Sequence, residues 1–302
     1  MSPEGREALA WVESPLQFVA AAEYAAAHDR RVSVAFRLTD PQMTSTAREL
    51  LDRGAPFTHC APYYGVPWAL LARHRDWIVG DAFSGQFRAA LSTLGARSVV
   101  AVDDGVITVS LARALLGATG YHRPGQRESR LRVVLGGLSR ERLLRLAARD
   151  RMTLFTVFSD DAAVAALPAH GITVETDELA WTRATARPAP LPHPRVVLGS
   201  AQVADGILPL ESYLGWLADV ARQGPVSYLP HRRESAELLE WVALLPGVEL
   251  VRTALPVELV LAGHTEPLEI VSLTSSAATT LRHVLAGTGS VIRTTSIPQV
   301  VR

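Results

Sequence analysis

The sequence contains no lysine, and its 30 strongly basic residues are all arginine. This absence excludes catalysis through a lysine Schiff base and phosphate binding by a Walker-type lysine, because both need a primary amine. The single cysteine, Cys60, excludes an internal disulfide bond and a zinc site built from several cysteines. A lone cysteine is also typical of a reducing compartment, so we expect a cytoplasmic protein.

Long apolar runs are absent as well. No stretch reaches the roughly 20 apolar residues that a membrane-spanning helix needs. The first residues show no basic segment followed by an apolar one, so we expect no signal peptide. Any membrane contact is therefore expected to be peripheral, at the inner face of the membrane.

Neither sign of charge is in excess, since the formal net charge is zero. The chain as a whole thus has no electrostatic attraction to nucleic acid, and we expect no nucleic-acid partner. The glycine fingerprint G-x-G-x-x-G does not follow the first apolar run, which argues against a dinucleotide-dependent dehydrogenase.

What the chain does contain is a regular alternation of short apolar runs and helical segments. In the first half we expect strands at 8–13, 31–36, 76–80, 98–102 and 152–158, with helices between them. In the second half we expect strands at 195–200, 225–230 and 268–273, again separated by helices. This alternation predicts parallel sheets of the doubly wound kind.

A proline-rich segment at 183–195 separates the two halves and is expected to be an extended linker. The predicted fold class is therefore α/β, with two Rossmann-like domains facing a cleft. The expected N-terminal domain covers 1–185, and the expected C-terminal domain covers 193–302.

Polar groups follow two strands of the first half. Asp103-Asp104-Gly105 comes directly after a buried strand, where a carboxylate can take a proton from an acceptor hydroxyl. An Asx turn with glycine at positive φ is the structural alternative. No further Asp or His stands at ligand spacing, so a metal site is not expected. Ser14-Pro15-Leu16-Gln17 ends the first strand and could line the cleft, or could simply start a helix.

In the second half, His231, Arg232 and Arg233 are expected at a helix N-terminus, where anions are stabilised. A histidine there could donate to a leaving phosphate; the alternative is a surface loop. Ser275 and Ser276 precede another helix and could hold phosphate oxygens, or could act as an ordinary N-cap.

Two further positions in the second half are candidates for donor binding. Gly199-Ser200 ends a strand, where the backbone can approach a ligand closely, although a plain turn is the alternative. Glu258 lies in an apolar stretch and needs a partner there, which could be ribose hydroxyls or a buried arginine.

The segment 121–151 is rich in arginine, with nine arginines against three acids. It could contact an anionic acceptor or a membrane surface. A solvated helical hairpin is the alternative that the pattern favours.

The order of these motifs resembles the bacterial sialyltransferases and polysialyltransferases of the GT-B fold. The shared pattern runs from Trp11 to about Leu281 and is specific through its order, since each motif is short. It departs from the family at the histidine, because here Pro230 precedes His231 where the family has a His-Pro motif.

The resemblance implies a role for each motif. Asp103 would be the general base, with Asp104 supporting it, and His231 would stabilise or protonate the departing phosphate of CMP. Ser275 and Ser276 would bind that phosphate. Arg232 would stabilise its charge, and Glu258 would bind the ribose.

The expected function is thus the transfer of sialic acid, or a related nonulosonic acid, from a CMP-activated donor to a glycan or glycolipid acceptor. The resemblance implies inversion of configuration, with no metal and no cofactor. The alternatives are a transferase that uses UDP or GDP sugars on the same scaffold, and a non-catalytic nucleotide-binding relative.

Overall fold

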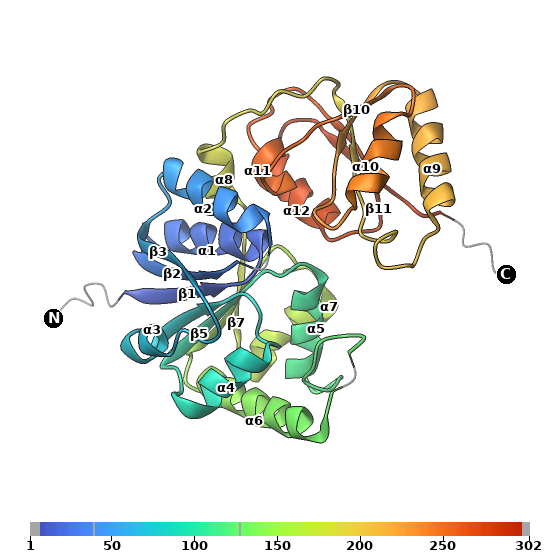
Figure 1. Ribbon diagram of the computed structural model, residues 1–302. Helices are drawn as coiled ribbons and strands as arrows, with labels where there is room; N and C mark the ends of the chain where they lie inside the picture. The colour runs from blue at the N-terminus through green and yellow to red at the C-terminus, as the bar shows by residue number, and fades with distance from the viewer. Residues whose placement is uncertain (1–6, 39, 127, 298–302) are drawn as a thin grey trace. The chain divides into compact units, whose positions relative to one another are not determined.

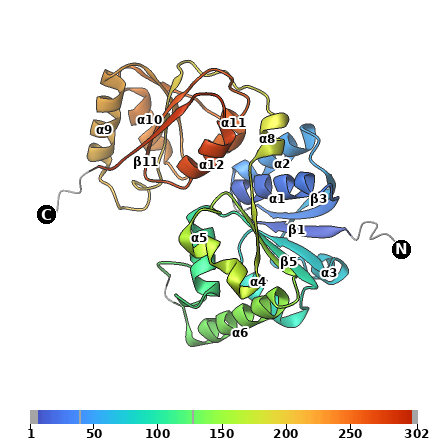
Figure 2. The ribbon, with the colours of Figure 1, turned by 180° about the vertical axis from the view of Figure 1, so that it is seen from behind.

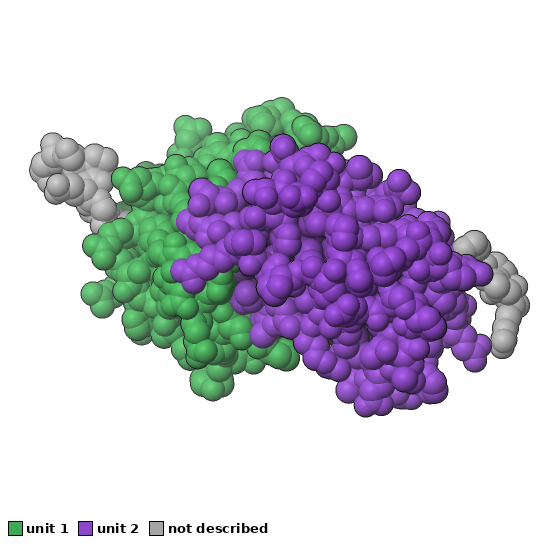
Figure 3. Space-filling model, turned by 90° about the horizontal axis from the view of Figure 1, so that it is seen from above, with its two compact units in different colours: residues 1–181 green, residues 182–302 purple. Residues whose placement is uncertain are grey.

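The apolar segments form two parallel sheets in the computed structural model, which describes residues 7–38, 40–126 and 128–297 (Figure 1). The chain divides into two compact units, unit 1 at residues 1–181 and unit 2 at 182–302, coloured separately in Figure 3. The proline-rich segment 183–195 therefore lies at the start of unit 2. Among the described residues, no helix has the length and apolar character to span a membrane.

Unit 1 contains a seven-stranded sheet in the order β3-β2-β1-β4-β5-β6-β7. Its strands are β1 (Ala8–Val12), β2 (Val32–Arg37), β3 (Phe57–Tyr63), β4 (Asp76–Val79), β5 (Ser98–Val102), β6 (Met152–Thr156) and β7 (Thr173–Thr176). All neighbouring pairs are parallel. The strand order reverses between β1 and β4, which is the switch point of this sheet.

Helices cover both faces of this sheet (Figures 1 and 2). They are α1 (Pro15–Ala27), α2 (Gln42–Asp52), α3 (Trp68–Arg73), α4 (Gly85–Thr93), α5 (Val106–Leu115), α6 (Arg130–Ala147), α7 (Ala162–Ala165), the 3-10 helix η1 (Leu167–His170) and α8 (Ala180–Ala184). Helix α8 spans the division between the units. The segment 121–151 thus holds one long helix, and the helical hairpin expected there is wrong.

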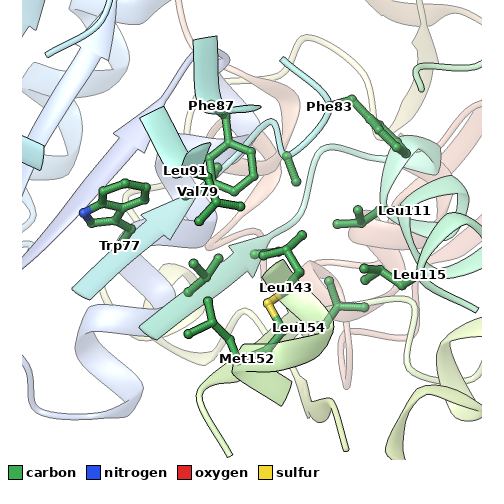
Figure 4. Packing of buried hydrophobic residues seen from close by; sticks show 14 of the residues in the cluster. Trp77, Val79, Phe83, Phe87, Leu91, Leu111, Leu115, Leu143, Met152 and Leu154 are labelled. Carbon is green, nitrogen blue, oxygen red and sulfur yellow. The ribbon is translucent and has the colours of Figure 1, made fainter. Parts of the chain in front are cut away.

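The core of unit 1 lies between the sheet and helices α3 to α6 (Figure 4). Trp77 and Val79 from β4 and Leu154 from β6 meet Phe87 of α4 and Leu143 of α6, and all five are buried. Burying a large apolar side chain stabilises a fold by about 1.5–3 kcal/mol, so this layer fixes the sheet on which the strand-end residues stand.

Unit 2 contains a five-stranded sheet in the order β10-β9-β8-β11-β12. Its strands are β8 (Arg195–Leu198), β9 (Val226–Leu229), β10 (Val248–Leu250), β11 (Glu269–Leu273) and β12 (Val291–Thr295). Its helices are α9 (Leu210–Arg222), α10 (Ala236–Ala243), α11 (Val257–Leu261) and α12 (Ala277–Val284). Here the strand order reverses between β8 and β11, so β8 and β11 flank the switch point.

The predicted strands are all present, but β3, β7, β10 and β12 were not among them. β3 contains Pro62 and is mostly exposed or half-buried, and no residue of β7 or β12 is fully buried. These three strands lie at the edges of their sheets. An edge strand buries fewer side chains, so its apolar pattern is weak.

Candidate functional site

Asp103 lies at the carboxyl end of β5 and is almost completely buried, with 1% of its surface exposed. Its carboxylate accepts a hydrogen bond from the Thr156 hydroxyl at 2.5 Å and from the backbone N–H of Val157 at 2.7 Å. These contacts join the end of β5 to the end of β6. The side chain expected to be the general base therefore serves to hold two neighbouring strand ends together.

Asp104, the next residue, is more accessible, with 16% of its side chain exposed. The Ser14 hydroxyl donates to its Oδ1 at 3.4 Å, and an Arg123 nitrogen lies 3.8 Å from its Oδ2. Its backbone N–H donates to the Thr108 hydroxyl at 3.0 Å. Gly105 follows with φ at 65°, a conformation that glycine adopts without strain, and α5 begins directly after it.

A row of charged side chains surrounds Asp104 at the same edge of the sheet. Arg123 pairs with Asp81, which follows β4, as well as with Asp104. Glu13, which follows β1, lies 3.2 Å from Arg37 at the end of β2. Burial raises the pKa of Glu13 above its ordinary value, and the Asp81 carboxylate raises it further. This edge of unit 1 thus holds several carboxylates balanced by two arginines.

The Ser14-Pro15-Leu16-Gln17 turn has both of its expected features. Ser14 caps α1, accepting a hydrogen bond from the N–H of Gln17, while its hydroxyl also reaches Asp104. Pro15 occupies the first turn of the helix. Gln17 is 2% exposed, accepts from the N–H of Glu13 at 2.7 Å and fills the space beside Gly80. Ser14 therefore contacts a side chain of the charged row, and Gln17 contacts the backbone of Glu13.

In unit 2, Glu234 joins the loops that follow β8 and β9. Its Oε1 accepts from the N–H of Ser200 at 2.9 Å and from the Tyr228 hydroxyl at 2.6 Å, while Oε2 accepts from the N–H of His231 at 3.0 Å. Burial raises the pKa of Glu234, and these donors act in the opposite direction. The carboxylate thus fixes both strand ends.

Gly199 is the position at which these two loops come closest. A Cβ atom there would lie 2.4 Å from the backbone nitrogen of His231 and 2.6 Å from Oε2 of Glu234. No side chain fits, which explains the glycine. The close approach predicted at Gly199 is therefore made to the protein itself.

His231 lies after β9, half-buried, with its Nδ1 accepting the backbone N–H of Arg233 at 3.2 Å. In the neutral ring, a proton acceptor at Nδ1 places the proton on Nε2. His231 can therefore act as a donor through Nε2.

The helix expected to begin at these residues starts later. α10 begins at Ala236 and is capped by Ser235, whose hydroxyl accepts from the N–H of Leu238 at 3.1 Å. His231, Arg232 and Arg233 thus precede the first residue of α10 by three to five residues, with the cap residue Ser235 between them and the helix. Arg232 and Arg233 are exposed in the turn before it, and Arg233 pairs with Asp205.

Ser275 and Ser276 lie directly before α12, at the carboxyl end of β11. Ser276 is the N-cap residue, yet its side chain makes no capping hydrogen bond. The ordinary N-cap alternative therefore does not account for its hydroxyl. The backbone N–H groups of Ala278 and Thr279 donate to the carbonyl oxygens of Ser275 and Ser276. Two hydroxyls directly before a helix N-terminus are an arrangement suited to an anion.

Glu258 lies on α11, 5% exposed, and its Oε1 accepts the Thr280 hydroxyl of α12 at 2.7 Å. Burial raises the pKa of this carboxyl, and the bond from Thr280 opposes the rise. This bond joins α11 to α12, the helix that Ser276 begins. The ribose contact predicted for Glu258 stays a prediction.

Within the described part of the chain, no three His, Cys, Asp or Glu side chains come together as a possible metal site. The candidate site residues Asp104 and Glu234 lie instead after the carboxyl ends of β5 and β9, where Arg123 or backbone N–H groups contact them.

No protein-family model matches the chain, and no curated protein matches it in sequence. Solved structures do match. A UDP-glucose:anthocyanidin 3-O-glucosyltransferase in complex with UDP aligns with a TM-score of 0.52 and 11% identity, over 95% of this chain and 80% of its own. UGT2 of Phytolacca americana, complexed with UDP-2-fluoro-glucose and pterostilbene, aligns with a TM-score of 0.51 and 12% identity, over 96% and 80%.

The chain has the GT-B fold. At this level of identity the likeness concerns the fold, and it extends across both units of the chain. Neither of these two GT-B neighbours is a sialyltransferase, so the resemblance to that family stays a prediction.

Four residues that contact the candidate site residues or one another were not selected from the sequence: Glu13, Asp81, Arg123 and Glu234. Asp81 follows a predicted strand just as Asp103 does, so the same rule would have found it. Glu13 is the last residue of the predicted strand 8–13, whereas β1 ends at Val12. Glu234 stands three residues after His231, the spacing at which a glutamate reaches back to a backbone N–H. Arg123 gave no local signal, because its partners are 42 and 19 residues away in the sequence.

Proposed function

We propose that this protein is an inverting glycosyltransferase that uses a nucleotide-activated sugar. The observation that carries the proposal is the arrangement of unit 2, where Ser200, His231, Ser275 and Ser276 follow three adjacent strands, β8, β9 and β11. Ligands of doubly wound sheets bind at the carboxyl ends of strands near the switch point. The GT-B fold supports the same conclusion.

We assign the donor phosphate to Ser275, Ser276 and the N-terminus of α12, because serine hydroxyls and the positive end of a helix stabilise anions. His231 is assigned to the same phosphate through Nε2, since its Nδ1 already accepts the N–H of Arg233. Glu234 is assigned a positioning role, because it holds the loops that carry Ser200 and His231.

We assign the general base to Asp104, in place of Asp103. Asp103 is buried and receives hydrogen bonds from Thr156 and Val157, whereas Asp104 is partly exposed within the charged row. Arg123 and the Ser14 hydroxyl hold Asp104 in position. A carboxylate held in position in this way can accept a proton from an acceptor hydroxyl.

The proposed reaction is a single displacement. Asp104 takes the proton from an acceptor hydroxyl while the hydroxyl oxygen forms a bond to the anomeric carbon. The bond from that carbon to the donor phosphate oxygen breaks, and the phosphate leaves with the electron pair. His231 and the start of α12 stabilise the charge that builds on the leaving oxygen. The proposal requires no metal ion.

As the first candidate donor, we propose a UDP-activated sugar. Both structural neighbours contain UDP or a UDP sugar, which supports a uridine nucleotide on this scaffold. A CMP-activated nonulosonic acid is the second candidate, and the order of the Asp-Asp-Gly, His, Glu and Ser-Ser motifs favours it. A glycan or glycolipid is the proposed acceptor class.

A thermal-shift panel tests this proposal, with UDP, UDP-glucose, CMP, CMP-sialic acid, GDP and NADH, each with and without EDTA. A ligand at about 100 times its dissociation constant stabilises the folded state by roughly 2.7 kcal/mol. We expect a shift with UDP and UDP-glucose that EDTA does not remove. A shift with CMP compounds alone would move the assignment to the second candidate. No shift with any nucleotide would overturn the proposed function.

A further inference from the structure

The first two turns of α6 leave an apolar stripe facing solvent. The stripe consists of Leu131, Val134 and Leu138, which are 70%, 60% and 46% exposed. Their spacing of three and four residues places them on one face of the helix. Single exposed apolar residues are common, but a contiguous group of them marks an interaction surface.

This exposed start of α6 is held firmly on the body of unit 1. Arg88 of α4, which is buried, makes a two-point ion pair with Glu128 at 2.8 and 2.9 Å, and also donates to the carbonyl of Arg132. Gly136 lies against the backbone of Tyr121, so closely that a Cβ would come within 2.5 Å of the Tyr121 carbonyl oxygen. These contacts fix the start of α6, which carries the stripe, on unit 1. The helix itself lies at the periphery of unit 1 (Figures 1 and 2).

The charge around the stripe is positive. Arg130 and Arg132 are exposed in the same turn as Leu131, and residues 129–140 contain no Asp or Glu. Glu141 follows, exposed and paired with Arg145. Glu128, just before them, is 9% exposed in its pair with Arg88. The chain as a whole has no net charge, so this local excess is specific to the start of α6.

We propose that this surface, made of Arg130, Leu131, Arg132, Val134 and Leu138, docks the protein on an anionic phospholipid membrane. Arginines attract anionic headgroups, and aliphatic side chains on one helix face enter the headgroup boundary. A protein partner typically meets aromatic anchors, and this surface has none. The inference is independent of the nucleotide-sugar proposal.

Sedimentation with vesicles tests it, using phosphatidylcholine alone and phosphatidylcholine mixed with phosphatidylglycerol, without nucleotide. We expect binding to the mixed vesicles that weakens as salt is added. Each arginine near an anionic surface contributes about 1 kcal/mol, so Arg130→Glu/Arg132→Glu should lower binding at least roughly thirtyfold. Leu131→Glu/Val134→Glu should lower binding by about tenfold or more.

Leu244→Glu is the matched control, because Leu244 is 73% exposed in unit 2 and should bind vesicles as the unaltered protein does. Unchanged melting temperatures show that each variant is folded. Absence of binding, equal binding to both kinds of vesicle, or unaltered binding by the two double variants would overturn the proposal. So would a dimer, seen by sedimentation velocity without lipid, that Leu131→Glu/Val134→Glu abolishes, since the stripe would then bind a second copy.

Discussion

Adjacent residues at the end of β5 have different surroundings, and this difference assigns their roles. Asp103 points into the protein, where Thr156 and Val157 bind its carboxylate, while Asp104 joins the charged row through Ser14 and Arg123. The sequence motif alone does not distinguish the two, since both are aspartates after one buried strand. Their partners come from other strands and loops, which only the fold brings near.

Replacement of Asp104 should affect catalysis, and replacement of Asp103 should affect stability. We expect Asp104→Asn to lower kcat by about a hundredfold to ten-thousandfold, because a positioned base contributes that much, with nucleotide binding retained. Asp103→Asn should lower the free energy of unfolding by about 1–3 kcal/mol, because a buried acceptor is lost. Steady-state kinetics and urea unfolding of both variants measure this.

The opposite results for the two variants would assign the role of general base to Asp103. A stable Asp103→Asn protein without turnover, together with a fully active Asp104→Asn protein, would contradict the assignment proposed here. Equal nucleotide binding by both variants serves as the control for an intact unit 2.

At the scale of elements, the sequence located the carboxyl ends of the buried strands. β5, β8, β9 and β11 were all predicted, and the polar groups that follow them were chosen for that reason. The edge strands β3 and β7 escaped prediction, because their residues are not continuously buried. The start of α10 was misplaced, since Ser235 outcompetes the preceding residues as a cap.

Glu234 shows what an element-level pattern cannot reveal. Its carboxylate binds groups from β9 and from the loop after β8, and Tyr213 of α9 also donates to it at 3.3 Å. The sequence shows a glutamate shortly before a helix, a common position for an acid. Its burial, and hence its raised pKa, follows only from packing.

The serines at the starts of α10 and α12 should respond differently to replacement by alanine. Ser235→Ala should cost about 1 kcal/mol of stability, because its hydroxyl caps α10. Ser275→Ala/Ser276→Ala should change stability by less than about 0.5 kcal/mol, because neither hydroxyl caps α12 through its side chain. The double variant should instead weaken nucleotide binding about tenfold or more, through lost bonds to phosphate.

Urea unfolding and calorimetric titration with UDP measure the two effects, with Ser235→Ala as the matched control for binding. Unchanged nucleotide affinity in the double variant would remove the start of α12 from the donor site.

At the scale of the whole molecule, several buried carboxyls share one direction of pKa shift. Burial raises the pKa of Glu13, Glu234 and Glu258, and raises that of Asp177 well above its ordinary value, with Glu23 adding to the last. Such groups hold protons more tightly in the folded state than in the unfolded state. Their contribution to stability is complete below the unfolded-state pKa and is lost as pH rises through the folded-state pKa.

Asp177→Asn should therefore stabilise the protein at neutral pH. Asparagine avoids the buried charge and can still accept the N–H of Leu179, as Asp177 does at 2.9 Å. Urea unfolding at about pH 8 and about pH 5 should show a gain that shrinks at the lower pH, because the raised pKa leaves less of the aspartate charged there. A gain of the same size at both values would show that charge is not its cause.

The strand orders of both units also bear on how the chain is made. β1 and β8 are the first strands of their units, yet each lies inside its sheet, and its second neighbour, β4 or β11, is the fourth strand to be synthesised. Each of these buried strands must keep one row of backbone groups unpaired while some 60 or more residues emerge from the ribosome, at about 5–20 residues per second. For several seconds, an interior strand of each unit thus has an open edge that chaperones can recognise.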